Sequence, residues 1–363
     1  MPPSTFHPTE ASSPSHTGEG CRGAAGSRDG ERLYPTEVSS PSLTGEGCRG
    51  AVGSRDGERL LLVLLGPTSI GKTALSLRLA EHYGCPIINA DSRQLYRDLP
   101  IGTAAPTAEE QARVKHYFVG TLGLGDYYSA AQFQADALGV LQREYRERRV
   151  MIAAGGSMMY LDALCHGIDD IPTVSPEVRD HLHRRLADEG PEALLAELRL
   201  IDPDYYAQCD LRNVKRVVHA LEVYYQSGRP FSTFLTGRGT SRLNPGLAAL
   251  GVRVVKIGLD RPREELFSRI NRRAEQMLRD GLLDECRRVM PWRHLNSLNT
   301  VGYKEMFQHL DGTWTLPFAL ARMQKNTRVY AKKQLTWFRR DPSIHWFHPD
   351  DEAGVHDLLR TAF

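Results

Sequence analysis

The strongest constraint on this chain is a glycine-rich turn between an apolar run and a helix-forming segment. Residues 60–65 are uninterrupted apolar residues, the length of a strand buried on both faces in a parallel sheet. Residues 66–73 follow with GPTSIGKT, which fits the pattern G-x-x-x-x-G-K-[ST]. Such glycines let several backbone N–H groups face one anion, and the next helix adds the positive end of its dipole. We therefore predict a phosphate or diphosphate site; the alternative is a purely structural glycine-rich turn.

Two side chains of this turn have distinct expected roles. Lys72 would neutralise the outer phosphate, and the Thr73 hydroxyl would ligate Mg²⁺, the expected cofactor. The predicted loop consists of Gly66, Pro67, Thr68, Ser69, Ile70, Gly71, Lys72 and Thr73.

Composition restricts the size, compartment and metal content expected of this protein, but it does not indicate an activity. The chain has 363 residues, 41% of them hydrophobic, enough for one large or two modest domains. A net charge of +2 says nothing about nucleic acid, so any basic surface has to be local. The six cysteines are far apart without metal-ligand spacing, and no apolar segment is long enough to span a membrane. We expect a reduced, cytoplasmic protein without structural zinc.

Residues 1–59 differ from the rest of the chain. They are rich in Gly, Ser, Pro and Thr and nearly free of large aliphatic residues, so we predict a disordered tail. Residues 7–33 recur as residues 34–60 with four changes in a period of 27, a near identity that favours duplicated DNA. Two copies without a hydrophobic face cannot form a stacking array. The functional alternative is a tail that binds a partner.

Further strands predict a doubly wound α/β fold. Residues 85–96 read as a short strand whose end delivers Asp91 to the carboxyl edge of the sheet, where ligands of open α/β sheets bind. The alternative for Asp91 is a helix cap, since Asp91 and Gln94 have the spacing of a capping box. Other strands are expected at 115–120, 150–157 and 252–259. We predict a P-loop NTPase-like parallel sheet flanked by helices, built from residues 60–172 and 241–345.

The remaining segments read as helices. Residues 173–240 have helical periodicity and form a predicted all-helical insertion domain. A long helix begins near Arg263 and bends or breaks at Gly281, a loop covers 299–306, and a last helix runs from 317 to 340. Six basic residues and no acid lie between Lys325 and Arg340, a pattern that suits a phosphate backbone. The alternative is a solvated face on a packed helix.

Together these segments resemble the motif series of the tRNA dimethylallyltransferases (tRNA isopentenyltransferases). The resemblance covers residues 60–340, in the family's order, and no C-terminal zinc finger is present, which favours the bacterial type. The motifs are GPTSIGKT, NADSRQLY, IGTAAPT, RVVHALEV, RINRRAEQML, GLLDE, TVGYKE and AKKQLTWFR. Family members move a dimethylallyl group from dimethylallyl diphosphate to N6 of adenosine 37 in tRNA.

The resemblance implies a role for individual residues. Thr68, Lys72 and Thr73 would hold the donor's diphosphate with Mg²⁺, and Arg269 or Arg273 would reach the same oxygens. Asp91 would accept the proton of the adenine amine. The implied partners are tRNA and dimethylallyl diphosphate, and the helical insertion at residues 173–240 would face the tRNA. We expect a monomer. The implied tRNA contacts are Asp91, Ser92, Arg93, Gln94, Ser157, Arg179, Lys215, Arg216, His219, Gly302, Tyr303, Lys304, Lys332, Lys333 and Arg339.

Some positions depart from the family pattern. Ser69 and Ile70 replace the usual Ala-Ser, GGSMMY stands where GGTGLY is usual, and His219 replaces an Arg, which leaves that tRNA contact in question.

Three other functions remain open on the residues alone. They are a small-molecule kinase using ATP and Mg²⁺, a prenyltransferase for free adenine nucleotides, and a non-catalytic RNA-binding module.

Overall fold

The computed structural model describes residues 58–169, 171–235 and 243–362. Apart from Glu58 and Arg59, the predicted tail of residues 1–59 lies outside the described residues, as does the end of the predicted insertion at 236–240.

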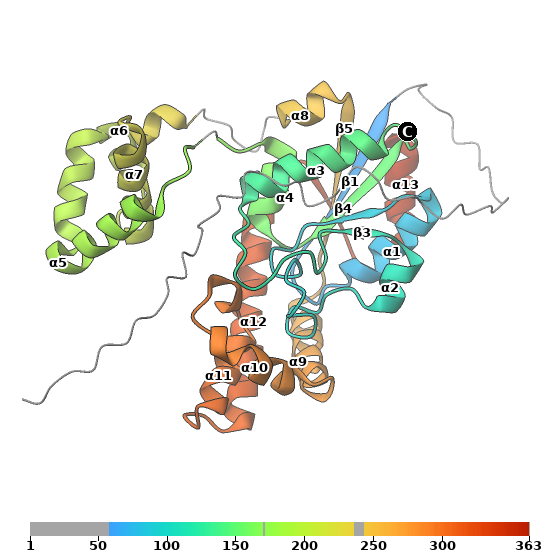
Figure 1. Ribbon diagram of the computed structural model, residues 1–363. Helices are drawn as coiled ribbons and strands as arrows, with labels where there is room; N and C mark the ends of the chain where they lie inside the picture. Colours follow the sequence, from blue (N-terminus) through green and yellow to red (C-terminus); the bar gives the residue numbers. More distant parts are fainter. Residues whose placement is uncertain (1–57, 170, 236–242, 363) are drawn as a thin grey trace, which may run out of the picture. The chain divides into compact units, whose positions relative to one another are not determined.

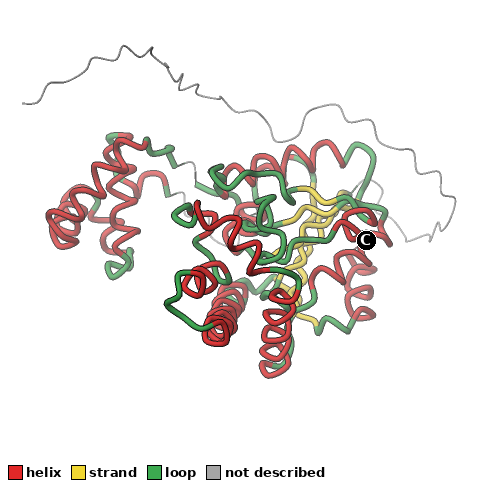
Figure 2. The backbone as a smooth tube through the Cα atoms, turned by 60° about the horizontal axis from the view of Figure 1, so that its bottom comes forward, coloured by secondary structure: helices red, strands yellow, loops and turns green. Residues whose placement is uncertain are grey.

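The core is a parallel sheet with the strand order β3-β2-β4-β1-β5-β6 (Figure 1). Its strands are β1 (Arg59–Leu65), β2 (Ile87–Asn89), β3 (His116–Tyr117), β4 (Val150–Gly155), β5 (Val252–Leu259) and β6 (Ile344–Phe347). The apolar residues of β1 are fully buried because β1 lies between β4 and β5 and helices cover both faces of the sheet. Figure 2 shows these helices on either side of the strands. The predicted parallel α/β sheet is therefore confirmed.

Helices connect the strands and cover the sheet. Helix α1 packs on β1, β2 and β4, α3 packs on α4, and α8 packs on β5. These helices are α1 (Lys72–Tyr83), α2 (Ala108–Arg113), α3 (Ala130–Glu144), α4 (Met158–His166) and α8 (Pro245–Ala249).

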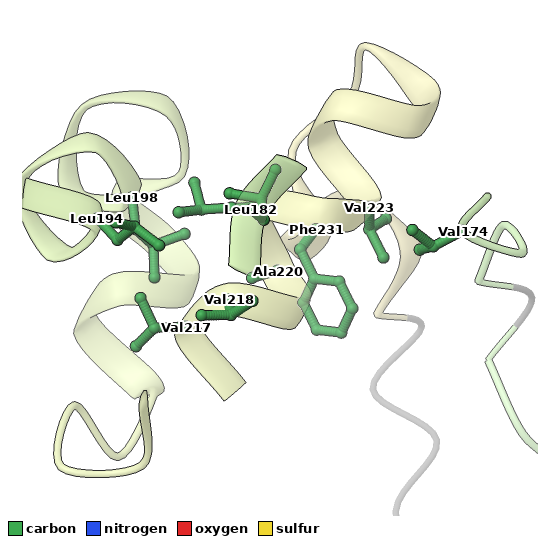
Figure 3. Packing of buried hydrophobic residues seen from close by; sticks show 10 residues of the cluster. Val174, Leu182, Leu194, Leu198, Val217, Val218, Ala220, Val223 and Phe231 are labelled. Atoms are coloured by element: carbon green, nitrogen blue, oxygen red, sulfur yellow. The ribbon is translucent and has the colours of Figure 1, made fainter. Parts of the chain in front are cut away.

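Residues 176–234 are helical, as their periodicity predicts. They form α5 (Pro176–Ile201), α6 (Pro203–Gln208), α7 (Val214–Ser227) and the 3-10 helix η1 (Phe231–Phe234). Helix α5 is broken at Gly190, immediately before Pro191. Leu182, Leu194 and Leu198 of α5 belong to one buried cluster with Val217 and other residues of α7 (Figure 3). These helices thus have a hydrophobic core of their own.

A second set of helices follows β5. They are α9 (Arg263–Arg279), α10 (Leu282–Val289), the 3-10 helices η2 (Met290–Trp292) and η3 (Asn296–Leu298), α11 (Tyr303–Leu310), α12 (Leu316–Phe338) and, after β6, α13 (Glu352–Ala362). The predicted break occurs at Gly281, whose φ of 100° is favourable for glycine. The loop predicted at 299–306 is wrong from Tyr303 onward, because Glu305 accepts a hydrogen bond from the Gly302 amide (2.7 Å) and starts a helix. Strand β6 and α13 were not predicted.

Candidate active site

The predicted phosphate loop connects the central strand β1 to α1. Gly66 has φ 148°, and a Cβ atom there would lie 2.9 Å from the Leu259 carbonyl oxygen, so glycine is required. Lys72, the first residue of α1, donates to the carbonyl oxygens of Gly66 (3.0 Å) and Pro67 (2.8 Å). These bonds hold the ammonium group at the loop.

Three charged groups meet beside this loop. Burial lowers the pKa of Lys72 to about 8; Asp91 opposes this shift and Arg273 adds to it. Burial also lowers the pKa of Arg273, again opposed by Asp91. The structure thus brings two cations and one carboxylate, predicted from three separate segments, into one electrostatic neighbourhood. Their net positive charge suits an anionic ligand.

Asp91 lies just beyond the end of β2, as expected, but it does not cap a helix. Residues 91–94 form turns, and the Asp91 carboxylate accepts a hydrogen bond from the amide of Arg93 (2.9 Å), as in an Asx-turn. Gln94 donates to the carbonyl oxygens of Thr103 (3.1 Å) and Ala104 (2.9 Å), so it does not complete a capping box. The helix-cap interpretation is therefore wrong.

Neighbouring residues fix the Asp91 segment. The amide of Ser92 donates to the hydroxyl of the buried Ser157 (2.7 Å), at the start of α4. The Arg93 side chain donates to the carbonyl oxygens of Asn296 (2.9 Å) and Ser297 (3.3 Å). The start of α4 and the 3-10 helix η3 thus hold the turn that carries the carboxylate.

Gln334 of α12 is a site residue whose role the sequence did not indicate. It is buried, its side-chain oxygen accepts from the Thr68 amide (3.0 Å), and its side-chain nitrogen donates to the Gly156 carbonyl (2.8 Å). One amide therefore joins the phosphate loop to the turn after β4. Such a bridge between distant segments has no local sequence signal.

Two arginines donate hydrogen bonds to backbone carbonyl oxygens of the predicted phosphate loop. Arg269 Nε donates to the Ser69 carbonyl (3.0 Å) and Arg261 Nε to the Ile70 carbonyl (3.1 Å). Arg269 therefore binds the loop backbone. Its contact with diphosphate oxygens stays a prediction. Ser69 has φ 65°, and its buried hydroxyl oxygen has no hydrogen-bond partner among the described residues.

Thr73, the predicted magnesium ligand, is exposed in the first turn of α1. Among the described residues no cluster of three or more His, Cys, Asp and Glu side chains could hold a metal. This arrangement fits Mg²⁺, which is commonly held by one or two protein oxygens together with substrate phosphates.

Most residues implied as tRNA contacts are exposed. Lys332, Lys333 and Arg339 lie on or at the end of α12, and Lys304 lies on α11. Arg179 lies on α5, and Lys215, Arg216 and His219 lie on α7. His219 is 3.2 Å from the carboxylate of Glu222.

Gly302 and Tyr303 are exceptions. Tyr303 is fully buried, and its hydroxyl donates to Glu285 (2.6 Å), which also accepts from the amides of Ile101 (2.9 Å) and Gly102 (2.8 Å). The Tyr303 ring is therefore not accessible to RNA, and the implied side-chain contact is wrong. Through Glu285, Tyr303 instead helps to fix the loop at 101–104. A buried carboxylate with three donors explains why the ring packs inward.

Tyr330 of α12 is a second site residue whose role sequence reasoning missed. Burial, together with the Asp91 carboxylate, raises the pKa of Tyr330 to about 12, while Arg93 acts in the opposite direction. Tyr330 is therefore near the carboxylate, with 37% of the residue exposed.

The described helices include none that is both long and apolar enough to cross a membrane.

Comparison with known proteins gives a consistent result. The family model described as IPP transferase matches residues 94–341. The chain is 57% identical over 301 residues to tRNA dimethylallyltransferase 1 of Phocaeicola vulgatus, covering 83% of this chain and 98% of that protein. It is 55% identical over 300 residues to tRNA dimethylallyltransferase 1 of Bacteroides thetaiotaomicron, covering 83% and 95%.

Solved structures agree. The full-length tRNA isopentenylpyrophosphate transferase of Bacillus halodurans is similar with a TM-score of 0.59 and 33% identity, covering 83% of this chain and 96% of that one. A eukaryotic dimethylallyltransferase acting on tRNA gives a TM-score of 0.70 at 24% identity, covering 82% and 75%, a likeness of fold alone.

Proposed function

Because the chain belongs to the tRNA dimethylallyltransferase family and is therefore a tRNA prenyltransferase, we propose that its phosphate loop holds the diphosphate of dimethylallyl diphosphate. The observation that carries this proposal is the cluster of Lys72, Arg273 and Asp91 beside the loop. Cations are needed where the leaving group becomes negative, and a carboxylate is needed where the attacking amine loses its proton.

In the proposed reaction the bond between the allylic carbon and the diphosphate oxygen breaks, and its electron pair stays on oxygen. The Lys72 ammonium and the loop amides stabilise this developing charge. The lone pair of the adenine N6 forms the new C–N bond, and the N6 proton passes to the Asp91 carboxylate. Mg²⁺ held by Thr73 and the diphosphate would supply further charge neutralisation. The acceptor would be adenosine 37.

We propose that exposed cations bind the tRNA backbone. Lys332, Lys333 and Arg339 follow the surface of α12, the helix that also carries Gln334 and Tyr330 of the site. Lys215 and Arg216 give α7 a basic surface, which supports a tRNA-facing role for the insertion.

The test is to incubate the chain with unmodified tRNA, dimethylallyl diphosphate and Mg²⁺ and to measure nucleoside masses. We expect the dimethylallyl mass on adenosine 37, none on tRNA with guanosine 37, and none with Lys72→Ala. Transfer to free adenine nucleotides with no product on tRNA would contradict the proposal, as would turnover of ATP with phosphoryl transfer.

A further inference from the structure

The Arg261 side chain, at the end of β5, joins the phosphate loop to the C-terminal part of the chain. The side chain is only 7% exposed. Besides the bond to the Ile70 carbonyl, its guanidinium contacts the carboxylates of Glu265 and Asp350, the latter at 2.8 Å and 3.3 Å. A planar guanidinium with bonds in several directions has little freedom to turn.

The bond to Ile70 determines which way a loop amide points. The Ile70 carbonyl and the Gly71 N–H belong to one planar trans peptide, so they point to opposite sides. When Arg261 holds the carbonyl on its side of the loop, the Gly71 N–H is turned away from Arg261. Arg269 holds the preceding peptide in the same way through the Ser69 carbonyl. Two consecutive amides of the predicted anion site are thus oriented by arginines.

The segment that carries Asp350 is docked at several points. Strand β6 pairs with β5, and the Asp260 amide donates to the Phe347 carbonyl (3.0 Å). Pro349 lies directly against the loop, because a Cβ atom on Gly71 would be 3.5 Å from the Pro349 Cβ.

Helix α13 lies beside α1, the helix that begins in the loop (Figure 1). Arg78 of α1 pairs with Glu352 of α13 (2.8 Å), and the rings of His82 and His356 are 5.1 Å apart. Val355 and Leu359 of α13 are fully buried. The docking of this segment therefore fixes the position of Asp350 relative to Arg261.

We propose that residues 341–362 position the phosphate loop for diphosphate through the ion pair between Asp350 and Arg261. The segment lies almost entirely beyond the family match, which ends at residue 341. Arg261 and Asp350 are positioning residues, since they act on the loop peptide and not on the substrate. The proposal rests on the proposed function, because it takes the loop as the diphosphate site.

The test uses the full chain and inorganic diphosphate with Mg²⁺ as the probe, measured by titration calorimetry. Asp350→Ala should raise the Kd for diphosphate roughly three- to tenfold, as expected for losing one charge-assisted contact. The KM for dimethylallyl diphosphate should rise by the same factor, with the KM for tRNA unchanged. Deuterium exchange of the peptide covering residues 66–73 should be faster, and Asp350→Glu should restore part of the affinity.

The matched control is Asp357→Ala, which removes an exposed carboxylate of α13 that pairs with Arg360. It should bind diphosphate like the wild type. If Asp350→Ala lowers the melting temperature, Asp350→Asn provides a milder change with the same predicted direction.

The two proposals fail in different ways. Equal affinity of Asp350→Ala, Asp357→Ala and wild type, with binding still lost in Lys72→Ala, would overturn the positioning role alone. A wild-type chain that does not bind diphosphate, or a Lys72→Ala variant that binds it unchanged, would overturn the proposed function and this inference with it.

Discussion

Lys72 lies where burial and neighbouring charges oppose one another. Without a ligand, burial and Arg273 disfavour the ammonium form of Lys72, whereas Asp91 favours it. The resulting pKa is about 8. A bound diphosphate would add negative charge beside the ammonium and favour it further. Diphosphate binding and protonation of Lys72 would therefore favour each other.

This coupling predicts a pH dependence. Because only the ammonium form binds diphosphate well, kcat/KM for dimethylallyl diphosphate should fall about tenfold per pH unit above about pH 8, where the free enzyme loses the proton. Lys72→Arg is the control, since a guanidinium stays charged in this range. A fall near pH 8 that persists in the arginine variant would assign the titration to another group.

Asp91 provides a second prediction at this scale. Asp91→Asn keeps the acceptor for the Arg93 amide, so the variant should fold and bind both substrates. An amide cannot take the adenine proton, and prenyl transfer should be at least about a hundredfold slower. Single-turnover kinetics with prebound tRNA separates chemistry from binding. The nearby exposed Asp98→Asn should transfer normally, and normal transfer by Asp91→Asn would exclude it as the base.

Among the elements, α12 has two different faces. Its buried Gln334 holds the phosphate loop, while Lys332 and Lys333 are exposed beside it. Lys332 Nζ also lies 5.7 Å from the ring centroid of Phe267 on α9. A helix fixed on one side by a buried amide can present cations on the other at defined positions.

The basic face of α12 carries the prediction for tRNA binding. Replacing Lys332 and Lys333 by Ala should weaken tRNA binding and reduce the slope of log K against log salt by roughly one to two units. The affinity for dimethylallyl diphosphate should stay unchanged. Arg360→Ala on α13 removes one exposed cation that pairs with Asp357, and it should leave the slope as it is. An unaltered slope in the double variant would make this face a solvated surface only.

At the scale of the whole molecule, the described chain combines a sheet core with an insertion that has its own hydrophobic cluster. Residues 1–57 contribute a near-exact repeat with few large apolar side chains.

We therefore predict that deleting residues 1–57 changes neither the melting temperature nor the single-turnover rate appreciably. The physical reason is that the repeat contains too little apolar surface to stabilise the core. Deleting only residues 7–33 should give the same result. A loss of several degrees in either variant would show that the segment packs on the rest of the chain.

The sequence by itself determined the features that depend on short-range patterns. An apolar run followed by glycines, lysine and threonine specifies the central strand and the phosphate loop, because turn geometry and burial require those residue types locally. Helical periodicity likewise identified residues 173–240 as an all-helical insertion. The motif series carried the assignment to the family.

Tertiary structure decided what depends on contacts between distant residues. The anchoring of the Asp91 turn by Ser157, the burial of Tyr303 against Glu285 and the bridge made by Gln334 join residues from different segments of the chain. Strand β6 is only four residues long and pairs with β5 alone, so its strand conformation depends on a partner 88 positions away, as between Ile344 and Lys256. Such contacts leave no local periodicity, because their free energy is gained only when the sheet has formed.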